Sequence, residues 1–376
     1  MTIGFNRPHL AGNEIEYMLQ ALEKNRHISG DGVFTKRCHA WLEARLGGKA
    51  LLTHSCTAAL EMAALLCELS PGDEVLMPSF TFVSTANAVA LRGAVPVFVD
   101  VREDTLNIDE ALIEAAITPR TRAISVVHYA GVSCEMNAIM ATAQRYGLKV
   151  IEDAAQALLA SYHGRPLGTI GDLAAISFHE TKNLISGEGG ALMVNVPELA
   201  GRAEIIREKG TNRSSFFRNE VARYTWVDVG SSYLPSDMLA AFLLAQMEQA
   251  DALLGERLAI WGRYHAGLAD VEAAGLLRRP IVPPHCKHNG HLYYILLADL
   301  DQRRRLIAHM KTSGIDTPFH YVPLHSSPAG RRLTRAAAPL PVTDSIAERL
   351  VRLPMWYGML DEPDIVLDTV HKFFGR

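Results

Sequence analysis

The chain has 376 residues, of which 48% are hydrophobic and 21% charged, a composition that excludes a disordered protein. Its length predicts two or three domains. Lys and Arg together number 37 and Asp and Glu 41, which gives a net charge of -4. Because nucleic-acid binders usually carry an excess of basic residues, this balance predicts no nucleic-acid partner.

The sequence shows no sign of a membrane protein or of a metal protein. No apolar run approaches the ~18 residues that a membrane helix needs, and the first residues lack the pattern of a signal peptide. The five cysteines include no CxxC pair, so neither a zinc site nor a disulfide framework is predicted. No histidine spacing matches a metal motif. We therefore expect a cytoplasmic protein without a metal.

The elements predicted in chain order begin with an amphipathic helix at 12–24, the single helix expected in the first 45 residues, and a glycine-rich turn at 29–32. Short apolar strands then alternate with helices. Strands are expected at 50–53, 74–77, 95–99, 123–127, 148–152, 173–178 and 191–194, and helices at 57–69, 84–91, 109–117 and 135–146. Such alternation predicts an α/β fold, a mainly parallel sheet with helices on both faces.

The pattern changes after about residue 200. Residues 209–228 are polar, basic and aromatic, which predicts a long loop. One long helix is expected over 235–264. The remainder reads as a smaller α+β domain, with a strand at 292–297 and helices at 300–313 and 343–350. The predicted domains are therefore 1–245, the N-terminal segment with the large domain, and 246–376.

Ligands of parallel sheets bind beyond the carboxyl ends of the strands, and Lys182 lies just past the 173–178 strand. Ser177 precedes it, and a glycine cluster follows at 187–190. A lysine held in apolar surroundings loses its proton and attacks carbonyl groups. A solvated loop lysine is the alternative, and this segment alone slightly favours it.

Asp153 follows the 148–152 strand at the same edge of the predicted sheet. A carboxylate there can pair with a protonated pyridine nitrogen and keep the ring an electron sink, as pyridoxal phosphate chemistry requires. Helix capping ahead of Ala154 is an equally good interpretation.

Two more strand ends supply complementary features. Near Thr57 a helix begins, and its free amides and dipole suit a phosphate, although ordinary capping by Ser55 or Thr57 is the alternative. Phe82 follows the 74–77 strand and is placed to stack on a flat ring, although such a residue is more often core. Chance rarely places an amine, a pyridine partner, a phosphate seat and a stacking face at the strand ends of one sheet.

Four segments of the chain resemble the sugar aminotransferases of the DegT/DnrJ/EryC1/StrS family: 57–60, 150–156, 177–183 and 187–190. The resemblance covers nearly the whole chain. It implies a type I fold with pyridoxal 5'-phosphate as cofactor, and a homodimer with active sites at the subunit interface.

The resemblance also implies roles for individual residues. Lys182 would bond the aldehyde of the cofactor and later shuttle the proton, Asp153 would pair with the pyridine nitrogen, and Gln156 would lie near the ring hydroxyl. Phe82 would stack on the ring. The phosphate would be held by Thr57, Ala58 and Ser177.

One segment departs from the family pattern. The wider family often shows Gly-Tyr-Asn-Tyr-Arg where this chain has Gly-Ser-Ser-Tyr-Leu at 230–234. The asparagine that reaches the neighbouring subunit's cofactor phosphate is Ser232 here, a shorter donor. Leu234 replaces the arginine, which removes one candidate anchor for an anion.

Segments 210–214, 224–226 and 230–234 look like the branch of the family that makes dTDP-4-amino-4,6-dideoxygalactose for enterobacterial common antigen. That likeness implies transfer of an amino group from L-glutamate to C4 of a nucleotide-linked 4-keto-6-deoxyhexose, here dTDP-4-keto-6-deoxyglucose. Some polar residues are expected either to contact the nucleotide or sugar or to be solvated or structural: Lys209, Arg213, Arg218, Arg223, His128, His320 and His325.

Two other functions compete with this prediction. A sugar dehydratase of the same fold has histidine in place of the reactive lysine, so Lys182 argues against it, although His179 is nearby. A non-catalytic sensory or structural dimer is the second alternative.

Overall fold

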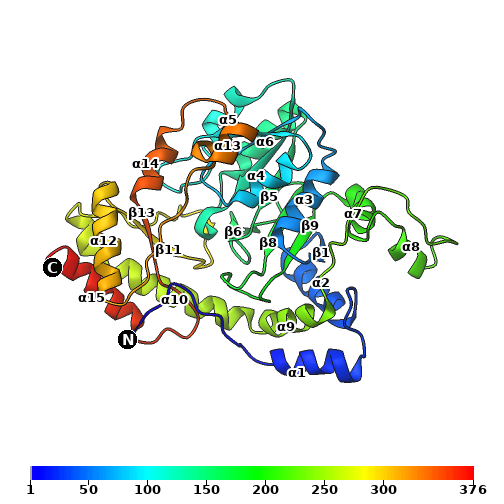
Figure 1. The fold of residues 1–376 in the computed structure, drawn as a ribbon, viewed down its shortest axis with the longest axis horizontal. Coiled ribbons are helices and arrows are strands. Elements are labelled where there is room, and N and C mark those ends of the chain that lie inside the picture. Colours follow the sequence, from blue (N-terminus) through cyan, green and yellow to red (C-terminus); the bar gives the residue numbers. More distant parts are fainter. Residues whose placement is uncertain (1) are drawn as a thin grey trace.

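The computed structural model describes residues 2–376, and an eight-stranded sheet lies at its centre (Figure 1). The strand order is β1-β9-β8-β5-β4-β2-β3-β12. β9 runs antiparallel to its neighbours β1 and β8, and the other neighbours pair in parallel, so the predicted mainly parallel sheet is confirmed. The strands are β1 (Lys49–Thr53), β2 (Glu74–Pro78), β3 (Val95–Val99), β4 (Thr121–Val127), β5 (Lys149–Asp153), β8 (Leu173–Ser177), β9 (Gly190–Val194) and β12 (Arg335–Ala336).

Helices cover both faces of this sheet, as predicted. The expected helices between the strands are α3 (Cys56–Leu66), α4 (Val83–Ala90), α5 (Glu110–Ala116) and α6 (Met136–Tyr146). α5 and α6 pack into the apolar core on one face, whereas α3, α4 and α7 (Ala200–Arg207) pack on the other. Asp109 caps α5 by accepting a hydrogen bond from the Ala111 amide at 3.0 Å, which explains where that helix begins.

The N-terminal region holds one helix more than predicted. α1 (Glu14–Leu19) continues as a π-helical turn (Gln20–Lys24), in agreement with the helix expected at 12–24. The structure adds α2 (Val33–Leu46), which packs on the large core. Its pattern is hard to recognise because the buried side of α2 includes Thr35, whose hydroxyl donates to Asp237 at 2.7 Å across 202 residues.

The single helix predicted at 235–264 is wrong, because the structure has two helices there. α9 (Asp237–Glu248) and α10 (Ala250–Gly267) meet at Gln249, whose φ of -102° and ψ of 10° are not helical. α9 packs on the large core, whereas Ile260 and Tyr264 of α10 pack in a second core. The break lets the chain pass from one core to the other.

The second core belongs to a smaller lobe that contains both chain ends (Figure 1). Ile3 packs into this core and donates its amide to the Gly314 carbonyl at 2.8 Å. The predicted domain boundary after residue 245 stays a prediction. The lobe contains β11 (Tyr293–Leu296), β13 (Leu350–Leu353), α11 (Ala269–Ala273), α12 (Leu300–Thr312), α14 (Pro341–Arg349) and α15 (Glu362–Phe373).

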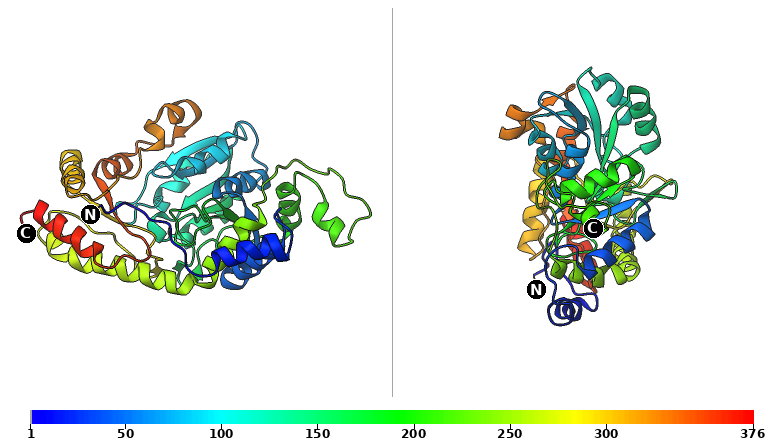
Figure 2. Two further views of the ribbon diagram at one scale, coloured as in Figure 1. Left: turned by 60° about the horizontal axis from the view of Figure 1, so that its bottom comes forward. Right: turned by 90° about the vertical axis from the view of Figure 1, so that its right-hand side faces the viewer.

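Short elements complete the fold. β6 (Ser161–Tyr162), β7 (Arg165–Pro166) and β10 (Cys286–Lys287) form a three-stranded sheet. In chain order, α13 (Pro328–Leu333) comes directly before β12. Residues 209–230, here called the arm, extend away from the rest of the chain in Figure 1 and in the left view of Figure 2. The predicted loop in the arm contains the short helix α8 (Arg213–Phe217). None of the helices in residues 2–376 is long and apolar enough to cross a bilayer.

Candidate active site

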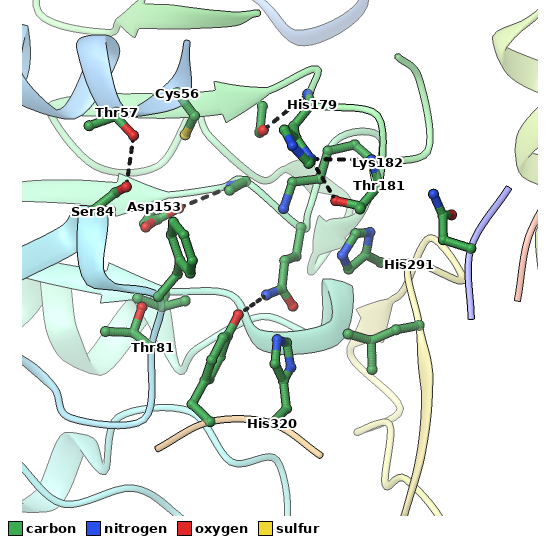
Figure 3. A pocket seen from close by; sticks show the side chains of 18 of the residues that line it. Cys56, Thr57, Thr81, Ser84, Asp153, His179, Thr181, Lys182, His291 and His320 are labelled. Carbon is green, nitrogen blue, oxygen red and sulfur yellow. Dashed lines mark hydrogen bonds between the residues drawn. The ribbon is translucent and has the colours of Figure 1, made fainter. Parts of the chain in front are cut away.

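A cavity of about 490 Å³ lies where the strands β1, β2, β5 and β8 end. Most of the residues predicted for the site line this cavity: Thr57, Phe82, Asp153, Gln156, Ser177 and Lys182. Ala58 is buried within α3 and does not line it, and Ser232 is exposed outside it. Figure 3 shows Thr57, Ser84 and Asp153 on one side of the pocket and Lys182 and His291 on the other.

Lys182 opens onto the cavity from the turn after β8, where its amide donates to the His179 carbonyl at 2.9 Å. Burial lowers the pKa of its ammonium group, an effect that the negative charge of Asp153 opposes. The alternative of a solvated loop lysine does not fit this position. The surroundings instead favour a neutral, reactive amine.

Asp153 lies at the end of β5 and is 5% exposed. Thr85 Oγ1 donates to its Oδ2 at 2.7 Å, and the Ala155 amide donates to its Oδ1 at 3.1 Å. Burial raises the pKa of this carboxyl, although these two hydrogen bonds oppose the change. The carboxylate caps a turn rather than a helix and still faces the cavity (Figure 3).

The start of α3 forms another wall of the cavity. Ser55 caps the helix by accepting from the Ala58 amide at 3.1 Å, so the ordinary capping interpretation holds for Ser55. The hydroxyls of Thr57 and Ser84 lie 2.7 Å apart and both line the cavity. Any side chain at Gly190 would collide with the backbone of Ser55 and Cys56, so glycine is needed where β9 meets this helix.

Phe82 and Gln156 also line the cavity, as predicted. Phe82 precedes α4 and is 59% exposed, so the interpretation of Phe82 as core is wrong. Gln156 accepts from the Ala130 amide at 2.7 Å through Oε1 and donates to the Tyr321 hydroxyl at 3.1 Å through Nε2. These two bonds fix which end of the amide faces which neighbour.

Sequence reasoning missed most of the wall that the smaller lobe contributes. His291 is buried with its Nδ1 3.0 Å from Asn183 Oδ1, and burial holds its pKa well below the usual range. The missed lining residues include Phe5, Asn6, Arg257, His291 and Arg352. No local pattern marks them, because they come from chain segments far from the strand ends.

The candidate histidines separate into two groups. His320 lines the cavity, and burial holds its pKa well below the usual range. His128 is buried against Glu152, 2.8 Å away, and His325 lies 2.8 Å from the Ser79 hydroxyl. Neither of these lines the cavity, so both are structural. Within residues 2–376 no group of three or more His, Cys, Asp or Glu side chains is arranged to hold a metal.

Glu152 shows how the chain beneath the site is held. Its carboxylate accepts from His128 and from the amides of Gly168, Ile170 and Gly171 at 2.6 to 2.9 Å. Burial alone would raise its pKa, but the bond to His128 and the backbone amides lower it overall. This network fixes the end of β5 just before Asp153.

The basic residues of the arm do not reach the cavity of their own chain. Arg218 pairs with Glu204 at 2.8 Å and with Glu220 at 2.7 Å. The other candidates also stay outside the lining: Lys209, Arg213 and Arg223.

The site combines a half-buried amine and a buried carboxyl with hydroxyl groups at a helix N-terminus, and these groups fit pyridoxal phosphate. A mainly parallel sheet with such a cavity at its carboxyl edge suits a pyridoxal-phosphate-dependent enzyme, and the comparisons give the class as a sugar aminotransferase. The sequence pattern of the DegT/DnrJ/EryC1/StrS aminotransferase family matches residues 8–371. The chain therefore belongs to this family, and its cofactor is pyridoxal phosphate.

Individual relatives agree with this placement. The spore coat polysaccharide biosynthesis protein SpsC of Bacillus subtilis is 35% identical over 97% of this chain and 95% of its own length. The putative sugar aminotransferase Spr1654 of Streptococcus pneumoniae, in its PLP form, has a TM-score of 0.91 at 26% identity, covering 99% of this chain and 98% of its own. Helicobacter pylori PseC, an aminotransferase of pseudoaminic acid biosynthesis, has a TM-score of 0.90 at 25% identity over the whole of both chains.

Proposed function

We propose that this enzyme transfers the amino group of L-glutamate to C4 of a nucleotide-linked 4-keto-6-deoxyhexose. The meeting of Lys182 and Asp153 in one cavity carries the proposal for amino transfer. The likeness of segments 210–214 and 230–234 supports dTDP-4-keto-6-deoxyglucose as substrate and dTDP-4-amino-4,6-dideoxygalactose as product. The product would serve surface polysaccharide synthesis, such as that of enterobacterial common antigen, and SpsC is likewise a polysaccharide biosynthesis protein.

Lys182 and Asp153 have complementary tasks in this proposal. Bound pyridoxal phosphate supplies an aldehyde that takes up amino groups and a ring that accepts an electron pair. Lys182, whose pKa burial lowers, would be the amine that bonds the aldehyde and would then move the proton at the reacting carbon. Asp153, held by Thr85, keeps a negative charge against the ring nitrogen, whose positive charge would stabilise the carboxylate.

Other residues of the cavity position the cofactor. We infer that the Thr57 and Ser84 hydroxyls and the first amides of α3 hold the phosphate, because a helix N-terminus attracts anions. Phe82 and Gln156 line the cavity, where Phe82 would cover one ring face and Gln156 would lie near the ring hydroxyl. Ser177, which lines the cavity, would complete the phosphate seat, whereas the Ala58 amide already donates to Ser55.

We also propose a homodimer with active sites at the subunit interface. Phe82 beside the cavity and Trp226 in the arm are 59% and 77% exposed, and large exposed apolar side chains mark contact surfaces. Ser232 at the base of the arm lies outside its own cavity, which suits a residue that serves the partner's phosphate seat. Five free cysteines agree with a cytoplasmic location. Light scattering at working concentration tests the dimer.

The product configuration follows from the position of Lys182. A single lysine delivers the proton to C4 from one fixed side, so the face that the sugar presents decides the configuration. We propose the galacto product, with an axial amine. The sugar orientation would be set by contacts to its nucleotide.

Mass spectrometry of products from dTDP- and UDP-linked 4-keto sugars with L-glutamate tests the proposal. We expect an amino sugar from dTDP-4-keto-6-deoxyglucose and an equal amount of 2-oxoglutarate. A sugar that loses water without consuming glutamate would indicate the dehydratase alternative, and no reaction would favour the non-catalytic one. Proton NMR of the product tests the configuration: a large H4 coupling to both neighbours would refute the galacto assignment.

A further inference from the structure

Arg352 is a cationic side chain in the cavity wall whose partner is missing. It lies on β13 in the smaller lobe and lines the cavity. Its guanidinium stacks 4.3 Å above the centre of the Phe5 ring and donates one bond to the Phe319 carbonyl at 3.2 Å. Its Nε is buried without a hydrogen-bond partner. No carboxylate of residues 2–376 lies within ion-pair distance of Arg352.

Apart from Lys182, the charged groups discussed next already have partners. Arg257 donates to the carbonyls of Gly290 and His291. Asp153 is bound by Thr85, and Glu188 lies 3.9 Å from His179. Asp316 is a counter-charge of Arg352 but lies beyond ion-pair distance. A half-buried arginine without a paired carboxylate is unfavourable, and a ligand anion would offset this cost.

Burial lowers the pKa of Lys182, and the positive charge of Arg352 adds to this effect. The charge of Arg352 likewise contributes to the lowered pKa values of His291 and His320. These effects place Arg352 within electrostatic reach of the reactive amine. Arg352 and Lys182 also line the same cavity, so an anion held by Arg352 would lie in the cavity where the reaction takes place.

Two ligand anions of the proposed reaction compete for this position. In the nucleotide sugar, the diphosphate is attached at C1, across the whole ring from the reacting C4. In the amino donor, a carboxylate is attached directly to the reacting carbon. A cation near Lys182 therefore suits the donor better, and the planar guanidinium matches a carboxylate with two parallel hydrogen bonds.

We propose that Arg352 binds a carboxylate of the amino donor. This assignment rests on the proposed transfer from an amino acid. This chain has Leu234 where the family pattern has an arginine that could bind an anion. Arg352, from the smaller lobe of the same chain, would then bind an anion instead. Arg352 holds the donor during the first half of the reaction and leaves the sugar's diphosphate to other residues.

The test compares Arg352→Gln and Arg352→Lys with Arg303→Gln in the holoenzyme. Arg303 is a matched control because its guanidinium lies 5.1 Å from the Phe319 ring, its Nε also lacks a partner, and it does not line the cavity. Calorimetry measures the binding of glutarate, an unreactive dicarboxylate. Stopped-flow absorbance measures the half-reaction with L-glutamate and, in the aminated enzyme, that with the keto sugar.

We expect Arg352→Gln to weaken glutarate binding about tenfold or more and to slow the glutamate half-reaction similarly at low glutamate. The glutarate affinity of Arg352→Lys should fall between those of Arg352→Gln and wild type. Lysine keeps the positive charge but cannot donate the two parallel hydrogen bonds of a guanidinium. The keto-sugar half-reaction and Arg303→Gln should stay within about twofold of wild type. L-Norvaline, which lacks the side-chain carboxylate, identifies which carboxylate is bound: an equal loss with this donor points to the α-carboxylate.

Unchanged glutarate binding in folded Arg352→Gln and Arg352→Lys would overturn the assignment. A loss confined to the keto-sugar half-reaction would also overturn it and would assign Arg352 to the diphosphate. Failure of the proposed function looks different: the wild-type enzyme would not react with L-glutamate, whatever its affinity for glutarate.

Discussion

The cavity and the arm differ in how far their charged and aromatic side chains are exposed to water. In the cavity, Lys182 and Asp153 stand at the ends of buried strands, and burial shifts the pKa of each. In the arm, Arg218 forms its ion pairs at the surface, and Phe217 and Trp226 are exposed. A substitution in the cavity should therefore lower the reaction rate and leave the fold intact. A substitution in the arm should change neither the reaction rate nor the fold of its own chain.

The difference also shows where a partner is needed. Asp153 and Gln156 in the cavity find their hydrogen-bond partners inside a single chain. The arm presents apolar rings that its own chain does not cover. This contrast agrees with the proposed dimer, in which the arm's contacts come from a second copy.

The largest effect is expected from Lys182→Ala. Turnover should fall on the order of 10³-fold or more, because no other group of the cavity supplies the amine and the proton. The melting temperature should change little, since Lys182 makes no ion pair within residues 2–376. Lys311→Ala, an exposed change on α12, is the control. Substantial remaining turnover would break the contrast between the two regions.

Asp153→Asn should have the second-largest effect on the reaction rate. It preserves the side-chain shape and removes the charge that keeps the ring nitrogen protonated. We expect the cofactor to bind and the half-reaction with L-glutamate to slow on the order of 10²-fold. Stopped-flow absorbance measures this rate. Asp172→Asn is the control, because Asp172 pairs with Lys149 at 3.1 Å outside the cavity. A rate near normal for Asp153→Asn would show that its charge is not needed.

The pH dependence of cofactor capture should show a smaller effect. Only neutral Lys182 attacks the aldehyde, so capture by the cofactor-free chain should rise with pH and level off above the pKa of Lys182. Burial places that midpoint below the ordinary value of 10.5. Asp153→Asn should move the midpoint lower still, because the Asp153 charge favours the ammonium form. An upward shift in that variant, followed by absorbance, would contradict this electrostatic account.

The smallest effect is expected in the arm. Arg218→Gln removes two surface ion pairs, and such pairs contribute little to stability. Calorimetry should show a melting temperature within about 2 °C of wild type, with a KM for the keto sugar within about twofold. If KM rose tenfold instead, the arm would belong to the substrate site. The statement that substitutions in the arm leave the reaction unchanged would then be wrong.

Much of the cavity could be predicted because strand ends can be located from sequence. Apolar runs placed β5 and β8 within a residue of their observed bounds, and parallel pairing brings their carboxyl ends to one edge. That placement brings Asp153, Ser177 and Lys182 to one edge of the sheet, and the family resemblance gives them their predicted roles. Phe82 needed the structure, because its exposure depends on what packs around the start of α4.

The smaller lobe's wall could not be predicted in the same way. Arg352 lines the cavity only because β13 pairs with β11 and the lobe docks against the large sheet. Likewise, β12 joins the large sheet beside β3 from more than 230 residues away along the chain. α2 was missed because part of its buried side is polar and bonds to Asp237. These features depend on long-range packing that local periodicity does not record.

The most direct measurement is to reduce the holoenzyme with borohydride and map the labelled peptide. Borohydride fixes the pyridoxyl group on whichever lysine holds the cofactor. The account predicts a single label on Lys182, in the peptide that continues from β8. A label on Lys209 or on another lysine, with Lys182 unmodified, would contradict it.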